Sequence, residues 1–273
     1  MAGTATRAGP RALGARHQKV ERLRRLVRRR SVRTSERAFV LEGTKVVGEA
    51  LAAGVPLEAV FVAPDAEGTA ALLQTAFDAG VRVHLLEHGV LERVAGTVTP
   101  QPVLAIAPFC DVPIEAVLGA DLVLVAVDVR DPGNAGTLLR NAEAAGTGGV
   151  VFCDGSVDVF NPKTVRASAG SLFHVPVVSG GEPAEVLTRL RQAGLRPFGT
   201  TARDGTPYDE ADLTARIALV LGNEAHGLPA GLDEVLDGVL TIPMAGRSES
   251  LNVGMAAAVL CFEVRRQLRA RPS

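Results

Sequence analysis

Short apolar runs alternate with longer stretches of helical pattern along most of the chain. In the first half, the apolar runs AFVLEG, EAVFVA and VRVHLL are separated by TKVVGEALAAG and GTAALLQTAFDAG. This alternation is typical of βαβ units, in which helices cover a parallel or mixed sheet. We therefore expect an α/β fold.

Changes in composition and in apolar pattern divide the sequence into four expected segments. Residues 1–37 form a basic N-terminal arm or helix, and residues 38–110 form a small α/β binding domain. The stretch 111–120 begins with Asp-Val-Pro and continues with a short helical pattern, which suggests a linker. Residues 121–273 then form a second α/β domain, which carries the motifs described below.

The net charge of −1 hides a strong asymmetry. Residues 1–37 hold 12 Lys and Arg against 2 Glu, a local charge of +10, whereas the rest of the chain sums to −11. Val20, Leu23, Leu26 and Val27 recur at helical spacing among these arginines, which predicts an amphipathic helix with a basic face. Such a helix is expected to contact nucleic acid phosphates. A solvated helix face and an Arg-rich organellar targeting peptide remain alternatives.

Several classes of protein are disfavoured by what the sequence lacks. No run reaches the about 18 to 20 apolar residues that span a bilayer, and the first residues do not form a secretory signal, so we expect a cytoplasmic protein without membrane contact. The cysteines Cys110, Cys153 and Cys261 are far apart and lack a C-x-x-C pair, so we expect buried thiols and no metal site. GxGxxG, GxxxxGK[ST], HExxH and GxSxG motifs are also absent.

A polar cluster follows the apolar run LVLVAVDV at 122–129. This run suits a strand that is buried on both faces, and ligands of α/β sheets lie at the carboxyl ends of such strands. A helix is expected next, with Asn134 as its N-cap and Gly146 as its C-terminal stop. Arg140 lies within that helix. Asn134 and Arg140 fit either a ligand site or a capping residue followed by a solvated cation.

A second apolar run leads directly into Gly222-Asn223-Glu224. The segment IALVLGNEAHGL covers residues 217–228, and its glycine permits close backbone approach beside a carboxylate. This arrangement favours a small polar ligand. A tight turn with an exposed Glu224 is the alternative.

A third segment, LTIPMAGRSESLNVGMAAAVLCFEVRRQL, occupies residues 240–268. Its strand stops at Pro243 and an irregular loop follows, after which Ser250 or Asn252 opens a long and mostly apolar helix. Three alanines on that helix, 256–258, permit close packing against another backbone, including that of another subunit.

Together and in this order, the segments resemble the three signature motifs of the SpoU (TrmH) family of RNA 2′-O-ribose methyltransferases, in the SPOUT superfamily. The matching stretches are DPGNAGTLLRNAEAAG at 131–146, LVLGNEAHGL at 219–228 and IPMAGRSESLNVGMAAAVLCFE at 242–263. The likeness covers residues 121–268. Through EGTKVVGEAL and TPQPVLAIA, the first half also resembles the small substrate-binding domain of rRNA-modifying members.

The resemblance implies an α/β catalytic domain with a deep C-terminal trefoil knot, which composition and periodicity do not indicate. It implies an S-adenosyl-L-methionine-dependent enzyme that acts on RNA and forms a homodimer through the catalytic domain. Ribosomal RNA of the 23S type is the expected substrate, because tRNA-modifying relatives often lack the extra domain. A tRNA 2′-O-methyltransferase and an RNA-binding homologue without catalysis are the alternatives.

The motifs also imply roles for individual residues. The implied cofactor contacts are Thr200, Gly222, Ile242, Met244, Leu251, Asn252 and Ala256. The implied catalytic residues are Asn134, Arg140, Glu224, Ser250 and Asn252. Because a guanidinium keeps its proton in ordinary protein surroundings, we expect Arg140 to bind the substrate phosphate and stabilise charge on the reacting oxygen. The proton would pass to phosphate, to water or to Glu224.

Overall fold

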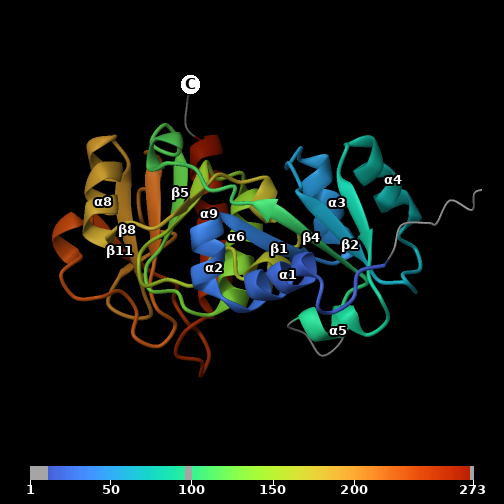
Figure 1. Ribbon diagram of the computed structural model, residues 1–273. Coiled ribbons are helices and arrows are strands. Elements are labelled where there is room, and N and C mark those ends of the chain that lie inside the picture. The colour runs from blue at the N-terminus through green and yellow to red at the C-terminus, as the bar shows by residue number, and fades with distance from the viewer. Residues whose placement is uncertain (1–11, 96–99, 271–273) are drawn as a thin grey trace, which may run out of the picture. The chain divides into compact units, whose positions relative to one another are not determined.

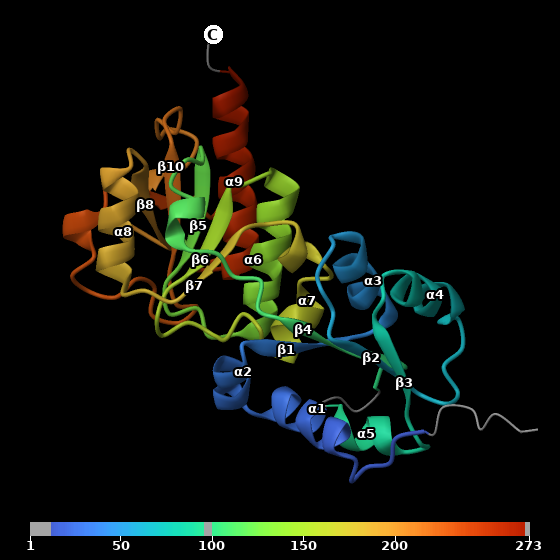
Figure 2. The same ribbon diagram turned by 45° about the horizontal axis from the view of Figure 1, so that its top comes forward.

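The structure is a computed structural model that describes residues 12–95 and 100–270. It divides into two compact units, Met1–Phe109 and Cys110–Ser273. The first eleven residues of the predicted basic arm lie outside the described residues. Figures 1 and 2 show each unit as a sheet with helices on both faces, which confirms the α/β prediction.

The first unit contains a four-stranded mixed sheet in the order β1-β4-β2-β3. Strand β4 is antiparallel to both of its neighbours, and β2 is parallel to β3. The strands are β1 (Ala38–Glu42), β2 (Ala59–Val62), β3 (Arg82–Leu85) and β4 (Val103–Pro108). The helices are α1 (Gln18–Arg28), α2 (Arg30–Glu36), α3 (Thr44–Ala52), α4 (Ala70–Asp78) and α5 (Val90–Val94). In Figure 2, α1 and α5 lie on one face of this sheet and α3 and α4 on the other.

Helix α1 confirms the amphipathic helix that was predicted in the basic segment. Val20, Leu23 and Leu26 are fully buried, and they pack in one core cluster with residues of β1, β2, β4 and α5. Val27 packs against the edge of the same cluster. The described part of the basic segment is therefore built into the core of the first unit.

The second unit contains a seven-stranded parallel sheet in the order β7-β6-β5-β10-β8-β11-β9. Its strands are β5 (Leu122–Ala126), β6 (Gly149–Phe152), β7 (Val177–Ser179), β8 (Arg196–Thr201), β9 (Thr206–Pro207), β10 (Ile217–Leu221) and β11 (Gly238–Thr241). Its α-helices are α6 (Pro132–Ala145), α7 (Pro162–Ala167), α8 (Pro183–Gln192) and α9 (Val253–Ala270). Short 3-10 turns cover Ile114–Ala116, Ser171–Phe173 and Asp233–Val235.

The layers of the second unit follow from which strands are buried. All five residues of β5 and all five of β10 are buried, as expected for central parallel strands that are covered on both faces. Figure 2 shows α6 and α9 on one face of the sheet and α8 on the other. Because the strands are parallel, their carboxyl ends share one edge, and the loops after β5, β8, β10 and β11 leave from that edge.

The segment predicted as a linker, 111–120, packs on the second unit. Its residues Ile114 and Val117 are buried in the core cluster that also holds β5 side chains. The amide of Val112 donates to the carbonyl of Val177 at the end of the sheet. Among the described residues, no helix is long and apolar enough to cross a bilayer.

The start of α6 corrects one prediction. Asn134 does not cap this helix, because the side chain of Asp131 accepts the Asn134 backbone N–H at 2.8 Å and Pro132 occupies the first turn. Proline is favoured at that position, where no backbone donor is needed, so Asp-Pro outcompetes Asn as the start signal. The other end agrees with prediction, since Gly146 ends the helix with φ 63°.

Gly136 of α6 lies close against the end of α7, and this packing can be tested. A Cβ there would lie 2.7 Å from the carbonyl carbon of Ala167 and 2.8 Å from the amide of Ser168. We expect Gly136→Ala to lower the free energy of unfolding by about 1 to 3 kcal/mol through overpacking, although alanine alone would favour the helix by about 1 kcal/mol. Urea unfolding measures this difference. Gly119→Ala is the control, because nothing lies within 4 Å of its added Cβ. Equal stability of both variants would contradict the packing.

Candidate active site

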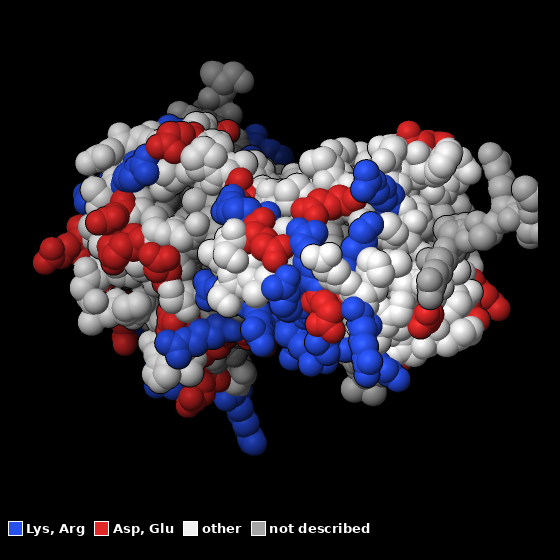
Figure 3. Space-filling view, in the orientation of Figure 1, with Lys and Arg blue, Asp and Glu red and all other residues white. Residues whose placement is uncertain are grey.

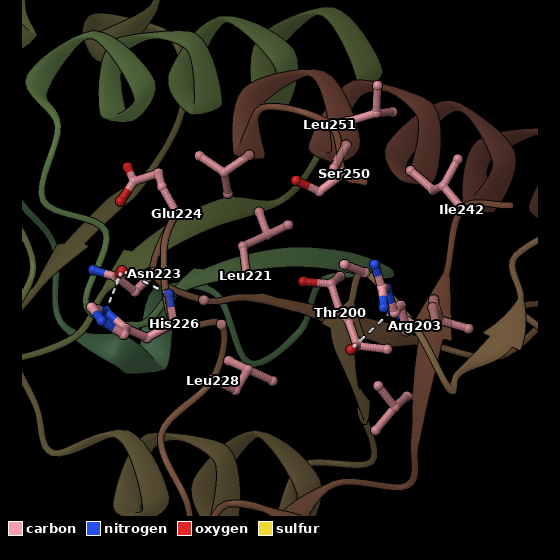
Figure 4. A pocket seen from close by; sticks show the side chains of 18 of the residues that line it. Thr200, Arg203, Leu221, Asn223, Glu224, His226, Leu228, Ile242, Ser250 and Leu251 are labelled. Carbon is pink, nitrogen blue, oxygen red and sulfur yellow. Dashed lines mark hydrogen bonds between the residues drawn. The ribbon is translucent and has the colours of Figure 1, made fainter. Parts of the chain in front are cut away.

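A cavity of about 910 Å³ opens at the carboxyl ends of β8, β10 and β11 in the second unit. Its walls come from the loops after these strands and from the first turns of α9, as Figure 4 shows. Most of the residues that the three motifs pointed to line it: Thr200, Gly222, Glu224, Ile242, Met244, Ser250, Leu251 and Ala256. Asn134, Arg140 and Asn252 are not among the lining residues.

A chain of side-chain hydrogen bonds joins the three motif segments beside the cavity. Asn252 Nδ2 donates to Asn134 Oδ1 at 2.8 Å, and Asn134 Nδ2 donates to Glu224 Oε1 at 2.7 Å. These pairs are 118 and 90 residues apart in sequence. The structure thus brings Asn134 and Asn252 to one carboxylate of the cavity wall.

The first residue of this hydrogen-bond chain, Asn252, sets its direction at the start of α9. Asn252 Oδ1 accepts the backbone N–H of Gly254 at 2.9 Å and so caps the helix, which leaves its amide NH₂ to face Asn134. Asn134 must then present its oxygen to Asn252 and its NH₂ to Glu224. Each amide is oriented by the previous bond, and the last acceptor is the Glu224 carboxylate.

Gly222 allows the turn that carries Glu224 to close on itself. A Cβ at Gly222 would lie 2.5 Å from the carbonyl oxygen of Gly227 and 2.6 Å from the amide of Leu228. Asn223 and Gly227 exchange two backbone hydrogen bonds of 2.8 and 2.9 Å across this turn. The close approach expected at Gly222 is therefore made to the protein backbone.

Asn223 ties the same turn to the end of β5. Its Nδ2 donates to the carbonyl oxygen of Asp128 at 3.0 Å, and its Oδ1 accepts the amides of Ala225 and His226. Asp128 has a left-handed backbone with φ 55°, which a short polar side chain tolerates. Glu224 is thus positioned through its backbone as well as through Asn134.

Helix α9 begins directly against α6. A Cβ at Gly254 would lie 2.6 Å from Cγ2 of Thr137, so only glycine permits this crossing. Asn141 Nδ2 donates to the Gly254 carbonyl at 2.6 Å. This contact fixes the first turn of α9, and with it the loop that carries Ser250 and Leu251.

Arg140 lies on the exposed face of α6. It is six residues beyond Asn134, which places its Cα about 9 Å further along the helix axis. Within the described parts of the chain, it makes no hydrogen bond and no ion pair. Its guanidinium is therefore available to a ligand from outside the cavity.

The wall of the cavity combines apolar and charged groups. Leu221, Leu228, Ile242 and Leu251 are among its lining residues, and Thr200 Oγ1 donates to the Val220 carbonyl at 3.1 Å. In Figure 4, Arg203 lies near Ile242 and Thr200, away from Glu224. Arg203 Nη2 donates to Glu249 Oε1 at 3.2 Å. The carboxylates Asp204, Glu224, Asp233 and Glu249 line the cavity with one arginine, so it favours a cationic ligand.

Sequence reasoning missed several lining residues. Asn223 and His226 lie inside the second motif, where the spacing of GNEAHG could have suggested an asparagine-centred turn. Arg203, Asp204 and Glu249 gave no local signal, because their position depends on two loops that meet only in the folded chain.

The three cysteines are not among the residues that line the cavity. Burial raises the pKa of the Cys110 thiol to about 11, with a further contribution from Asp111, and burial raises that of Cys153 to about 12. Such thiols stay protonated at neutral pH and are poor nucleophiles. In the described ranges, no group of three His, Cys, Asp or Glu side chains is arranged to hold a metal ion.

Comparison with known protein families places this site in a methylase. Residues 121–262 match the SpoU rRNA Methylase family, and residues 17–105 match the MRM3-like substrate binding domain. The chain therefore belongs to the SpoU rRNA methylase family, which confirms the resemblance drawn from its motifs. The MRM3-like match agrees with the second likeness, to a substrate-binding domain.

Individual relatives extend over nearly the whole chain. The 23S rRNA (guanosine(2553)-2′-O)-methyltransferase RlmP of Bacillus subtilis is 36% identical over 92% of this chain and 97% of its own. The AdoMet-bound rRNA methyltransferase of Sinorhizobium meliloti is 30% identical, with TM-score 0.79, over 92% of this chain and 95% of its own. The SpoU methyltransferase AviRb of Streptomyces viridochromogenes is 27% identical, with TM-score 0.82, over 93% and 98%.

Proposed function

We propose that this protein transfers the methyl group of S-adenosyl-L-methionine to a ribose 2′-hydroxyl of ribosomal RNA, of the 23S type. The observation that carries the proposal is the hydrogen-bond chain Asn252–Asn134–Glu224, which brings all three family motifs to one end of the cavity. The Bacillus subtilis relative, named for 23S rRNA, supports the choice of substrate.

The cavity fits S-adenosyl-L-methionine in size and charge. Its volume of about 910 Å³ lies within the range of about 300 to 1,000 Å³ that small-molecule sites occupy. The leucines and Ile242 offer an apolar wall for the adenine ring. The excess of carboxylates over Arg203 suits a ligand that carries a sulfonium and an ammonium group. Gly222, Ile242, Leu251 and their neighbours would hold the cofactor.

Glu224 is the residue that we assign to accept the proton. When bound, S-adenosyl-L-methionine supplies a methyl group that is electrophilic because it is attached to a sulfonium. Glu224 Oε1 is held by Asn134, and its other oxygen is available to the hydroxyl of the substrate. That oxygen takes the 2′-hydroxyl proton as the new C–O bond forms and the bond between the methyl carbon and sulfur breaks, which leaves a neutral thioether. A carboxylate held within hydrogen-bond reach of the hydroxyl is a competent general base.

Arg140 contributes positive charge beside the reacting oxygen. Since its guanidinium stays protonated, it acts as a cation that binds the phosphate next to the target ribose and stabilises negative charge on the 2′-oxygen. Arg140 makes no hydrogen bond or ion pair with the residues that the structure describes, which suits this role. Ser250, on the exposed loop before α9, positions the substrate or the loop itself.

The assembly state and topology are also part of the proposal. Met255, Val259 and Phe262 form an exposed apolar stripe along α9, at 62%, 36% and 50% exposure, and such a stripe suits a homodimer interface. The insertion of β10 between β5 and β8, followed by the return of α9 onto α6, supports the trefoil knot. Action on ribosomal RNA corresponds to the cytoplasm.

Gly222→Ala tests the cofactor site. The added Cβ would push the Gly227 carbonyl away and distort the turn, so we expect affinity for S-adenosyl-L-methionine to fall at least about tenfold, or about 1.4 kcal/mol. Calorimetric titration measures it. Gly246→Ala, in the loop between β11 and α9, is the control, because nothing lies within 4 Å of its Cβ. Unchanged affinity of the Gly222 variant would contradict the assignment.

Asn252→Asp tests the direction of the hydrogen-bond chain. An aspartate keeps the cap on α9 but presents oxygen to Asn134, whose amide then turns its oxygen toward Glu224. We expect kcat to fall at least about tenfold, while the free energy of unfolding changes by less than about 1 kcal/mol. Asn161→Asp makes the same change at the cap of α7 and should retain activity. Full activity of the Asn252 variant would refute the proposed orientation of Glu224.

Arg140→Ala tests the electrostatic role. With labelled S-adenosyl-L-methionine and unmodified rRNA, we expect kcat to fall about 10² to 10³-fold with unchanged cofactor affinity. The control is Arg189→Ala, which removes an exposed arginine of α8 that pairs with Glu115. This variant should transfer the methyl group at the normal rate. Unchanged methylation by the Arg140 variant removes this residue from the mechanism.

Two outcomes with the wild-type chain would redirect the proposal. RNA binding without cofactor affinity or transfer would favour a non-catalytic homologue. Methyl transfer to tRNA in preference to rRNA would favour a tRNA 2′-O-methyltransferase.

A further inference from the structure

A cluster of basic groups lies on the first unit where the start of α1 meets β3. It is formed by His17 and Lys19 at the start of α1 and by Arg82 and His84 on β3. Lys19 Nζ lies 2.9 Å from His84 Nε2. Because an ammonium can only donate, His84 accepts this bond and carries its own proton on Nδ1. We call these four residues the α1–β3 basic cluster.

This cluster has no acidic partner in the described chain. The pKa of His84 is lowered by its partial burial and then by the charges of Lys19, His17 and Arg82, all of which are basic. Strand β2, which pairs with β3, faces the His84 ring with Phe61 at 5.4 Å and carries no charged residue. Glu87, beyond the end of β3, lies against Gly14 and does not contribute to the His84 shift. The positive potential here is unneutralised.

Three arginines of α1, namely Arg22, Arg24 and Arg25, differ in this respect. Figure 3 shows Lys and Arg gathered over α1 with carboxylates among them. Arg22 is paired with Glu36 and Glu58, both at 2.6 Å, and Arg24 is paired with Glu21 at 2.7 Å. An RNA phosphate must displace these carboxylates to bind there. Glu21 and Glu36 are already counted in the local charge of +10, and Glu58 offsets one further positive charge.

We propose that the α1–β3 basic cluster binds the sugar-phosphate backbone of the RNA substrate. The inference rests on the proposed function, and it locates the RNA contact of the first unit. Lys19 and Arg82 are exposed cations from two elements that the fold holds together, and each can donate to phosphate oxygens. Because such contacts read the backbone, they position the RNA and do not select its sequence.

Phosphate binding should also change the protonation of His84. In the free protein, partial burial and then its basic neighbours favour the neutral ring, whereas a phosphate beside the ring favours the cation. The complex therefore binds more protons than the free protein at mildly acid pH. Affinity for RNA should rise as pH falls from 7 toward 5, and His84→Gln should weaken this pH dependence.

The test compares two charge-matched double variants of the full chain. A 23S rRNA transcript is the probe, and its binding is measured across a series of salt concentrations. For Lys19→Ala with Arg82→Ala, we expect the slope of log affinity against log salt to shrink by about 1.4 to 1.8, because each lost phosphate contact removes about 0.7 to 0.9. The KM for RNA should rise while kcat at saturating RNA is retained.

Arg24→Ala with Arg25→Ala is the control, since it also removes two positive charges, both of them from α1. Both of these arginines already face carboxylates, so we expect a smaller change in slope. Equal slopes for the two double variants, or an unchanged slope for the Lys19 and Arg82 variant, would overturn the basic cluster as the RNA surface. Absence of methyl transfer by the wild-type chain is a separate result that would overturn the proposed function.

Discussion

The hydrogen-bond chain from Asn252 through Asn134 to Glu224 is the constraint on which the active site depends. It joins the first turn of α6, the loop after β10 and the loop before α9, and each of its amides has only one orientation that satisfies both neighbours. The chain can form only if α9 starts against α6, which requires Gly254 beside Thr137. Packing of two helices thereby sets the position of a carboxylate at the end of the cavity.

The two units deal with charge in different ways. The second unit gathers carboxylates around its cavity and leaves Arg140 exposed outside it, which suits a cationic cofactor inside and an anionic substrate outside. The first unit pairs Arg22, Arg24 and Arg25 with carboxylates, whereas the α1–β3 basic cluster has no acidic partner among the described residues. The overall charge of −1 describes neither surface.

Much of this fold and part of the site could be predicted from the sequence. The strands, the amphipathic helix α1 and the glycine stop of α6 follow from local patterns, and the motif order identified the family. The prediction that Asn134 caps α6 was wrong, because Asp131 and Pro132 form a stronger start signal. The Arg203–Glu249 pair and the partners of Arg22 were not foreseen, because they join segments that meet only after folding. The charge count of residues 1–37 therefore does not include Glu58, which pairs with Arg22 from outside that segment.

The most direct test of the account is the chemical position of the transferred methyl group. Unmodified rRNA is incubated with the protein and methyl-labelled S-adenosyl-L-methionine, and the RNA is then digested to nucleosides and separated. The account predicts label on the ribose of a 2′-O-methylated nucleoside, with an alkali-resistant linkage at that position. Label on a base, or no label in any RNA while the cofactor binds, would contradict it.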